Sequence, residues 1–180
     1  MKRDWLQIFS NLAIVVGLIL VVIELNQNAV GQRAQAYNDI LERQITLASA
    51  IYEDDEFTQI WSDAAQEGKI LSPINSVRYT FYVIQLMQHY EDTLLQYRAG
   101  IIEPGAWLRQ RNQMGGITGQ PGFQSWWAAS KEYFTPDFVE VVDQMEPLKP
   151  VHQDPETGVW RRTDLWPQDP ASESKEDRDF

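Results

Sequence analysis

The chain has 180 residues, and not one of them is cysteine. This absence excludes disulfides and thiolate metal sites. Positive charge is also scarce, because 15 lysines and arginines stand against 26 aspartates and glutamates, which gives a net charge of -11. Nucleic acids are bound by clustered lysine and arginine, so we expect no nucleic-acid partner. The same shortage argues against a polybasic grip on an anionic membrane surface.

Glycine and proline are nearly absent from the start of the chain, where an apolar run, LAIVVGLILVVI, extends from Leu12 to Ile23. The run rises only about 18 Å as a helix, but the window from Trp5 to Leu25 rises about 31 Å, close to the roughly 30 Å hydrocarbon core of a bilayer. We therefore predict a single membrane-spanning helix within residues 1–30, with the lipid bilayer as its partner. The side chains expected to meet lipid include Leu12, Ile14, Val16, Leu18, Leu20, Val22 and Ile23.

Two alternatives to an uncleaved anchor remain open. A short apolar run can be a core helix or lie on a lipid surface, although this run is apolar on every face and little else in the chain could cover it. The charged start and the apolar run also fit a cleaved signal peptide. Its cleavage pairs, Ala29/Gly31 and Ala34/Ala36, lie well beyond the end of the run, which favours the anchor.

The distribution of basic residues around the run predicts its orientation. Lys2 and Arg3 precede it, and Arg33 and Arg43 follow within about 20 residues. This small bias favours an N-terminus in the cytoplasm and a domain outside the membrane. We expect a bacterial inner membrane, with the domain in the envelope.

Residues 31–146 carry apolar residues at helical spacing, which predicts one small helical domain. We expect one helix from about residue 4 to residue 52 that continues from the anchor into this domain. Its second half is expected to contribute an apolar stripe made of Tyr37, Ile40, Leu41, Ile45, Ala48, Ile51 and Tyr52. The fold class is therefore all-α, an anchor helix that continues into a bundle of four or five amphipathic helices.

Caps and breakers indicate where the later helices begin and end. Gly68 ends a short helix, and Ser72 with Pro73 begins a long one that Gly100 stops. The glycines of residues 115–122 (GGITGQPG) predict a flexible loop, and residues 147–180, rich in proline and acids, are expected to be mostly disordered. The long helix should bury the face formed by Val77, Phe81, Ile84, Met87, Tyr90, Leu94 and Tyr97.

His89 is the first candidate for chemistry, because it shares a helix face with Asp92. A di-iron bundle uses Glu-x-x-His on two helices, whereas this chain has His-x-x-Asp once. A hydrogen-bonded or solvated helix histidine is therefore the preferred interpretation.

Two further patterns have local explanations. The acidic residues 53–56 (EDDE) suit the first turn of a helix, and they lack the spacing and glycine of a calcium loop. The glycine-rich segment has no preceding strand and no lysine of a phosphate-binding loop. We predict no metal site and no cofactor.

Trp126 and Trp127 are the candidate interaction residues. Neighbours on a helix point about 100° apart, so one should enter the core and the other should lie at its rim. A tryptophan at the rim can anchor a protein partner or rest on a membrane surface. Packing alone is the simpler explanation for the pair.

The order of several segments resembles a widespread group of uncharacterised bacterial proteins with one N-terminal membrane helix and an all-helical domain. The segments are VVIELNQN, RAQAYNDILE, YEDTLLQYRAGIIEPGAW and GFQSWWAASKEYFTPDFVEVVD, and the resemblance covers about residues 5–145. It implies the anchor and the fold. The group has no activity that could be transferred, so it implies no functional residue.

The leading functional hypothesis is a non-enzymatic, membrane-anchored interaction or scaffold module. Its partner is expected to be a second copy, paired through the stalk helix, or another envelope protein. The first alternative is a ligand-binding sensor with an apolar pocket lined by Tyr82, Tyr90, Tyr97 and Trp107. The second is an enzyme that uses His89.

Overall fold

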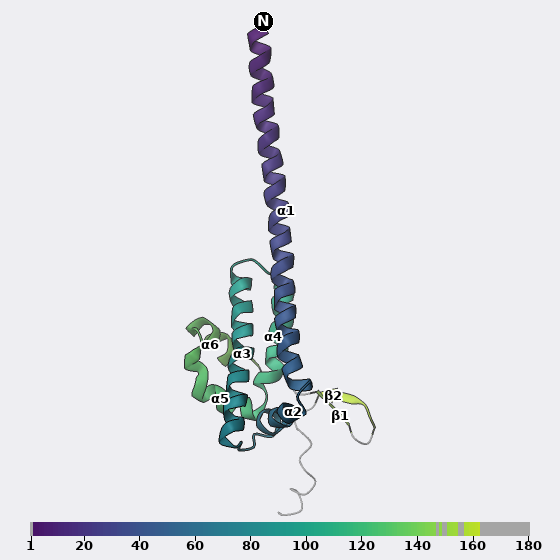
Figure 1. Cartoon of the computed structure of the whole chain (residues 1–180), viewed down its shortest axis with the longest axis vertical. Helices are drawn as coiled ribbons and strands as arrows, with labels where there is room; N and C mark the ends of the chain where they lie inside the picture. Colours follow the sequence, from purple (N-terminus) through teal and green to yellow (C-terminus); the bar gives the residue numbers. More distant parts are fainter. Residues whose placement is uncertain (1, 147, 149–150, 155–156, 163–180) are drawn as a thin grey trace, which may run out of the picture.

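The computed structural model describes residues 2–146, 148, 151–154 and 157–162, and over these residues the chain is predominantly helical. Helix α1 continues without a break from Lys2 to Tyr52, as the sequence predicts, and its first half projects beyond the rest of the domain (Figure 1). The elements that follow are α2 (Asp55–Trp61), the π-helix η1 (Ser62–Gln66), α3 (Pro73–Arg98), α4 (Pro104–Thr118), α5 (Pro121–Ser130), the 3-10 helix η2 (Lys131–Tyr133) and α6 (Pro136–Asp143).

The predicted caps position these helices. The Asp54 side chain accepts a hydrogen bond from the Phe57 backbone N–H at 3.0 Å and begins α2. Ser72 caps α3 in the same way, and proline occupies the first turn of α3, α4, α5 and α6. Gly68 and Gly100 adopt positive φ angles of 63° and 70°, which glycine accommodates without strain. They end η1 and α3, respectively.

The glycine-rich segment is helical, which corrects the prediction of a flexible loop over residues 115–122. Helix α4 continues to Thr118, so only Gly119 and Gln120 separate it from α5. Gly115 is buried, and a Cβ atom there would lie 3.2 Å from Cγ of Leu148. Close packing therefore explains this glycine, and the sequence pattern alone could not distinguish it from a glycine in a mobile turn.

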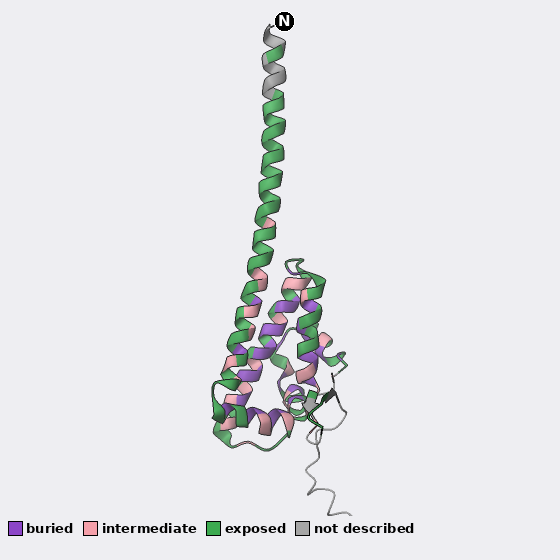
Figure 2. Ribbon diagram, turned by 90° about the vertical axis from the view of Figure 1, so that its right-hand side faces the viewer, coloured by how far each residue is buried: buried purple, intermediate pink, exposed green. Residues whose placement is uncertain are grey.

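The core lies where the second half of α1 packs against α2 and α3, and α4 packs against α3 and α5 (Figure 2). Phe138, Met87, Met114 and Val83 are fully buried. The face of α1 that contributes to this core contains the buried Ile40 and Leu47 rather than the whole predicted stripe. Three of the predicted stripe residues, Ile45, Ala48 and Tyr52, are exposed, since the inward face of the helix is rotated away from them.

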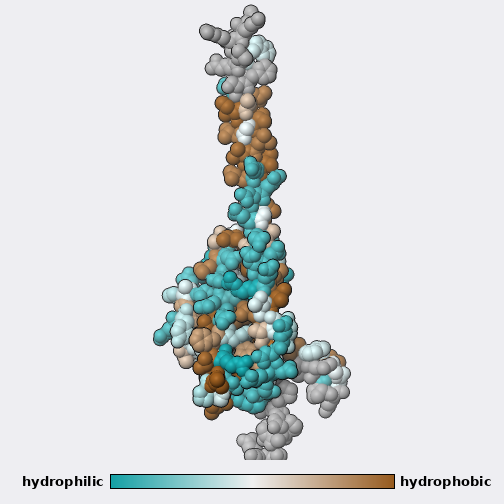
Figure 3. All heavy atoms as spheres, in the orientation of Figure 1, coloured by the Kyte–Doolittle hydropathy of each residue, from teal (hydrophilic) through white to brown (hydrophobic). Residues whose placement is uncertain are grey.

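Helix α1 is long and apolar enough to cross a membrane. Its most apolar window of 18 residues has a mean hydropathy of 2.0, and none of that window is buried by the rest of the described chain. On the face that Figure 3 shows, these apolar residues form a collar on the projecting part of the helix. Below the collar, the surface of α1 becomes polar before it reaches the domain.

Part of the segment predicted to be disordered forms a hairpin. Strand β1 (Val151–Gln153) pairs antiparallel with β2 (Trp160–Arg162), and Gln153 is opposite Trp160. The backbone N–H of Asp154 donates to the Val159 carbonyl at 2.9 Å, and Gly158 has a φ of 68°, so a tight turn is favoured. The prediction that residues 147–180 are mostly disordered does not include this hairpin, and residues 163–180 lie outside the described residues.

Candidate functional site

Trp127 is a buried residue of the core. Its indole Nε1–H donates to Oδ1 of Asp143 at 2.8 Å, and its ring stacks on Phe123 with centroids 5.9 Å apart. Lys131 Nζ lies 3.0 Å from the other Asp143 oxygen. The Trp127 hydrogen bond, followed by that of Lys131, lowers the pKa of the Asp143 carboxyl group. Trp127 therefore fixes α5 to the end of α6.

Trp126 is half-buried at the edge of the same aromatic cluster. Its ring lies 5.8 Å from Phe123 and meets Phe134 edge-on at 6.3 Å. Its indole nitrogen is buried, with no hydrogen-bond partner among the described residues. Both tryptophans thus contribute to packing between α5 and α6, and the rim residue turns its polar atom inward.

His89 lies between three helices. It is on α3, and the side chain of Gln110 on α4 lies against it. Gln110 Nε2 donates to Oε1 of Gln44 on α1 at 2.9 Å, so polar contacts connect α1, α4 and α3 inside the domain. His89 Nε2 and Gln110 Oε1 are both buried and make no hydrogen bond to another described residue within the usual distance.

The environment of His89 favours its neutral form. Burial lowers the pKa of the imidazole, and this effect outweighs the opposing contact with Gln110. The cavity beside it, which Asp92, Thr93 and Gln96 also line, has a volume of about 20 Å³. That volume holds nothing larger than a water molecule. His89 is therefore well placed to join helices, whereas a substrate would have to open the core to reach it.

The pocket predicted for a sensor is not formed by the expected residues. Tyr82 packs against Phe57 with ring centroids 5.1 Å apart, and its hydroxyl donates to the Leu47 carbonyl at 2.9 Å. Tyr97, in contrast, stacks on Trp107 of α4 at 5.9 Å, and Tyr90 is buried in the core. These four aromatic residues pack against their neighbours, and none of them lines a cavity described for this structure.

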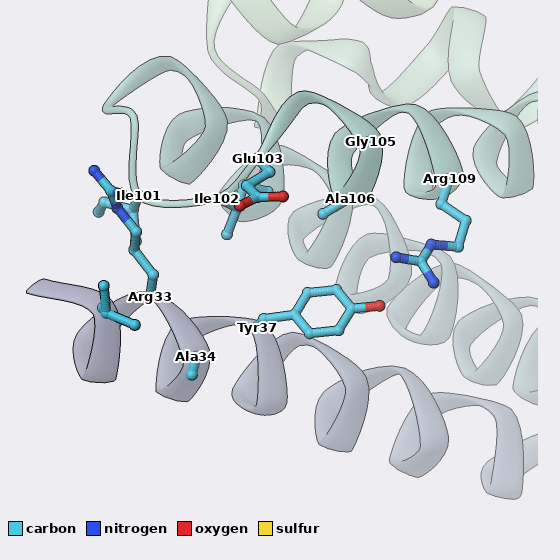
Figure 4. A pocket seen from close by; sticks show the side chains of 10 residues that line it. Arg33, Ala34, Tyr37, Ile101, Ile102, Glu103, Gly105, Ala106 and Arg109 are labelled. Atoms are coloured by element: carbon cyan, nitrogen blue, oxygen red, sulfur yellow. The ribbon is translucent and has the colours of Figure 1, made fainter. Parts of the chain in front are cut away.

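A cavity of about 510 Å³ lies elsewhere, between α1 and the start of α4 (Figure 4). The wall from α1 contains Val30, Arg33, Ala34 and Tyr37. The opposite wall contains Ile101, Ile102, Glu103, Gly105, Ala106 and Arg109. The cavity has the size of a small-molecule site, and its walls combine apolar side chains with a few charged groups.

Two arginines face this cavity from opposite helices. The Arg109 guanidinium lies 5.4 Å from the ring centroid of Tyr37, a cation–π contact, and Arg33 lies one helical turn before Tyr37 on α1 (Figure 4). Glu103 is the carboxylate in the wall. The sequence does not predict this cavity, because its walls come from helices about 70 residues apart and no local pattern connects them.

An exposed apolar surface runs along the first half of α3, and it corrects the face predicted for that helix. Val77 and Phe81 were expected in the core, but Phe81 is 62% exposed, and Tyr79, Tyr82 and Val83 are buried instead. The later part of the predicted face is confirmed, because Met87, Tyr90 and Leu94 are buried. Ile74, Val77 and Phe81 follow the i, i+3, i+7 spacing of one helix face. Ile70, fully exposed just before α3, extends this surface. We call these four residues the α3 ridge.

The acidic residues 53–56 have structural partners. Asp54 caps α2, and Arg78 of α3 bridges Asp54 and Glu56 at 3.0 and 2.9 Å. Within the part of the chain that the structure describes, no three histidine or acidic side chains gather as a metal site would require. The cluster therefore acts locally, where it fixes α2 to α3.

Comparison with known proteins gives no match: no protein-family model, no curated protein and no solved structure is similar to this chain. The resemblance to the bacterial membrane group stays a prediction from the sequence. The function is therefore inferred from the sequence and the structure of this chain.

Proposed function

We propose that this chain is a single-pass membrane protein whose helical domain is a scaffold, which assembles with further copies through the α3 ridge. The single observation that carries this proposal is the ridge. It is an exposed apolar surface on a helix whose opposite face is already buried in the core. Contiguous exposed apolar surfaces on soluble domains often mark interaction sites.

Continuity of α1 supports the anchor. The apolar window and the domain core belong to one helix, so the domain is held by a rigid stalk rather than by a flexible linker. Both pairs of small residues that could mark a signal-peptide cleavage site, Ala29/Gly31 and Ala34/Ala36, lie inside this helix. Cleavage at Ala34/Ala36 would remove part of the wall of the α1–α4 cavity. These features favour an uncleaved anchor.

The position of the ridge favours a protein partner over the bilayer. Helix α3 begins at the end of the domain farthest from the N-terminus and runs back toward it (Figure 1). From Leu25 to Tyr52 the stalk rises about 40 Å, so an upright α1 holds the ridge far above the lipid surface. Anchored copies in one membrane would carry their ridges at the same height. A two-fold axis normal to the membrane would bring two ridges together.

The absence of cysteine makes this proposal directly testable by disulfide cross-linking in membranes. We expect Phe81→Cys to form disulfide-linked dimers under mild oxidation, at twice the 20.9 kDa mass of the chain. A residue near a two-fold axis faces its own copy, which brings the two sulfur atoms within bonding distance. Gln113→Cys, an exposed position on α4, is the matched control and should stay monomeric.

A third variant distinguishes the ridge from the stalk. Ile45 is exposed on the outer face of α1, so Ile45→Cys reports on pairing through the stalk helix, the arrangement predicted from the sequence. Dimers of Ile45→Cys without dimers of Phe81→Cys would move the interface to the stalk. Equal, low cross-linking at Phe81 and Gln113 would contradict self-assembly through the ridge.

A further inference from the structure

The α1–α4 cavity, the space of about 510 Å³ between α1 and the start of α4, lies at the end of the domain closest to the membrane-spanning part of α1. The α3–α4 connection and the start of α4 form the end of the domain that faces the projecting half of α1 (Figure 1). The cavity lies between this end and the stalk, and Val30 and Arg33 are its stalk residues closest to the apolar window. It is therefore the part of the domain closest to the expected membrane surface.

Five of the eight basic side chains that the structure describes are paired with carboxylates. The described ion pairs join Arg43 to Asp92, Lys69 to Asp63, Arg78 to Asp54, Arg98 to Asp137 and Lys131 to Asp143. Arg33, Arg109 and Arg111 have no carboxylate within ion-pair distance among the described residues. Two of these three arginines line the same cavity. Most of the unpaired positive charge on the described side chains therefore lies at one concave site.

The charge of the cavity limits what it can hold. Arg33 and Arg109 contribute two positive charges and Glu103 contributes one negative charge, so the described walls carry a net charge of about one positive unit. A phosphodiester carries one negative charge and would neutralise this site. A phosphomonoester, with close to two negative charges at neutral pH, would experience more repulsion from Glu103.

The cavity begins at the outer edge of the headgroup layer of the bilayer in which the proposed function places α1. The layer extends roughly 5–8 Å beyond the hydrocarbon core on each side. If the hydrocarbon ends near Leu25, Val30 lies about 8 Å and Arg33 about 12 Å farther along the helix axis. An arginine side chain at that height can reach back to a lipid phosphate.

We propose that the α1–α4 cavity binds the phosphodiester headgroup of an anionic phospholipid from the membrane that holds α1. Arg33, at the Ile101 end of the cavity, donates hydrogen bonds to the phosphate oxygens, the interaction for which the guanidinium group is best suited, and Arg109 adds positive charge at the other end, beside Tyr37 (Figure 4). Val30 and Ile101 provide apolar wall where the glycerol and acyl chains leave the headgroup. The site is a specific pocket for one lipid, which a chain of net charge -11 can possess without a polybasic surface.

Native mass spectrometry of the full chain in mild detergent tests this proposal, with phosphatidylglycerol as the probe and phosphatidylcholine as the neutral comparison. We expect about one retained phosphatidylglycerol per chain. The double variant R33Q/R109Q should lower its occupancy by about tenfold or more, since it removes charge-assisted hydrogen bonds to phosphate. Arg111→Gln is the matched control, because Arg111 is an unpaired arginine of α4 outside the cavity wall, and it should retain the lipid.

A second variant keeps the test informative if R33Q/R109Q fails to fold. Glu103→Gln removes the carboxylate from the wall and should raise phosphatidylglycerol occupancy severalfold. Equal retention of phosphatidylglycerol and phosphatidylcholine, or equal loss in Arg111→Gln and R33Q/R109Q, would overturn the proposal. Glycerophosphoglycerol, the water-soluble phosphodiester that matches the phosphatidylglycerol headgroup, distinguishes the source, and binding as tight as that of the lipid would overturn a membrane origin.

The proposal depends on insertion of α1 but not on assembly through the ridge. Carbonate extraction of the same membranes separates the two possible failures. A chain released by carbonate would contradict the anchor. A chain that stays in the pellet, but whose lipid occupancy is unchanged in R33Q/R109Q, would contradict the lipid site alone.

Discussion

Gly122 lies at the closest approach between α5 and the π-helix η1. A Cβ atom at this position would be 1.7 Å from the backbone oxygen of Ala64, a contact that no side-chain rotation can relieve. Gly116, in the interior of α4, has no such neighbour within 4 Å. The two glycines occur in one glycine-rich stretch of sequence, yet their packing predicts opposite effects for the same substitution.

We expect Gly122→Ala to destabilise the domain by about 1–3 kcal/mol or more, because the added methyl group forces α5 away from η1. Gly116→Ala should instead stabilise it by about 0.5–1 kcal/mol, since alanine is the better helix former. Denaturant unfolding of the two variants, followed by near-ultraviolet circular dichroism in micelles, measures both changes. Similar changes in the two variants would contradict the described packing of α5 on η1.

His89 predicts a dependence of stability on pH. Its pKa is lowered in the folded domain, so the unfolded chain binds the proton more readily. Stability from this residue is therefore present above the ordinary histidine pKa of about 6.5 and falls as the pH drops below it. Arg43 and Asp92, which are paired with each other, act on His89 in opposite directions. We expect the midpoint temperature of thermal unfolding to decrease as the pH is lowered from 7.5 to 5.5.

The variant His89→Gln should show a smaller fall over this pH range, measured by thermal unfolding, whatever its stability at pH 7.5. The other histidine of the chain, His152, provides the control, and His152→Gln should keep the pH dependence of the unchanged chain. A pH dependence that persists in His89→Gln and disappears in His152→Gln would assign the titration to His152 and contradict the role of His89.

At the scale of the helices, α3 presents apolar side chains on two faces, and only one of them is in the core. Met87 is fully buried, so Met87→Ala should destabilise the domain by about 2–5 kcal/mol. Phe81→Ala should change the stability of the isolated chain by only about 0.5 kcal/mol, because its side chain is exposed. Denaturant unfolding in dilute micelles checks the pair, and a large loss for Phe81→Ala would mean that the ridge is covered.

Helix boundaries were largely predictable, whereas helix faces were not. Asp54, Ser72 and Gly100 act through backbone groups within a few residues, so local sequence is sufficient to place them. The choice between Phe81 and Tyr82 depends on where α1 and α2 lie, which the sequence of α3 does not contain. The same limit explains Gly115 of α4, because its partner Leu148 is distant in sequence.

The candidate sites also differ in how far the sequence could predict them. His89 and the two tryptophans could be recognised from their residue types, and the structure adds only their burial and partners. The α1–α4 cavity could not be anticipated, since Arg33 and Arg109 become neighbours of one space only after α1 and α4 pack. Unpaired arginines in an acidic chain are a signal that becomes visible once the ion pairs are known.

At the scale of the whole molecule, α1 determines both the height and the orientation of the domain. The slight excess of positive charge before the apolar run predicts a cytoplasmic N-terminus. We expect a membrane-impermeant maleimide to label Asn38→Cys in intact spheroplasts and Lys2→Cys only after lysis. The reverse pattern would place the domain in the cytoplasm, and the anchor itself would stand.

The anchor is tested most directly by a permeant, water-dependent maleimide on two single-cysteine variants, Gly17→Cys and Asn38→Cys. Both positions are exposed in the structure, so without a membrane their thiols should react at similar rates. Maleimides react with the thiolate, which does not form in hydrocarbon. In membranes we predict rapid labelling of Asn38→Cys and protection of Gly17→Cys until detergent is added. Equal labelling of the two thiols in membranes would contradict the membrane-spanning helix on which the account depends.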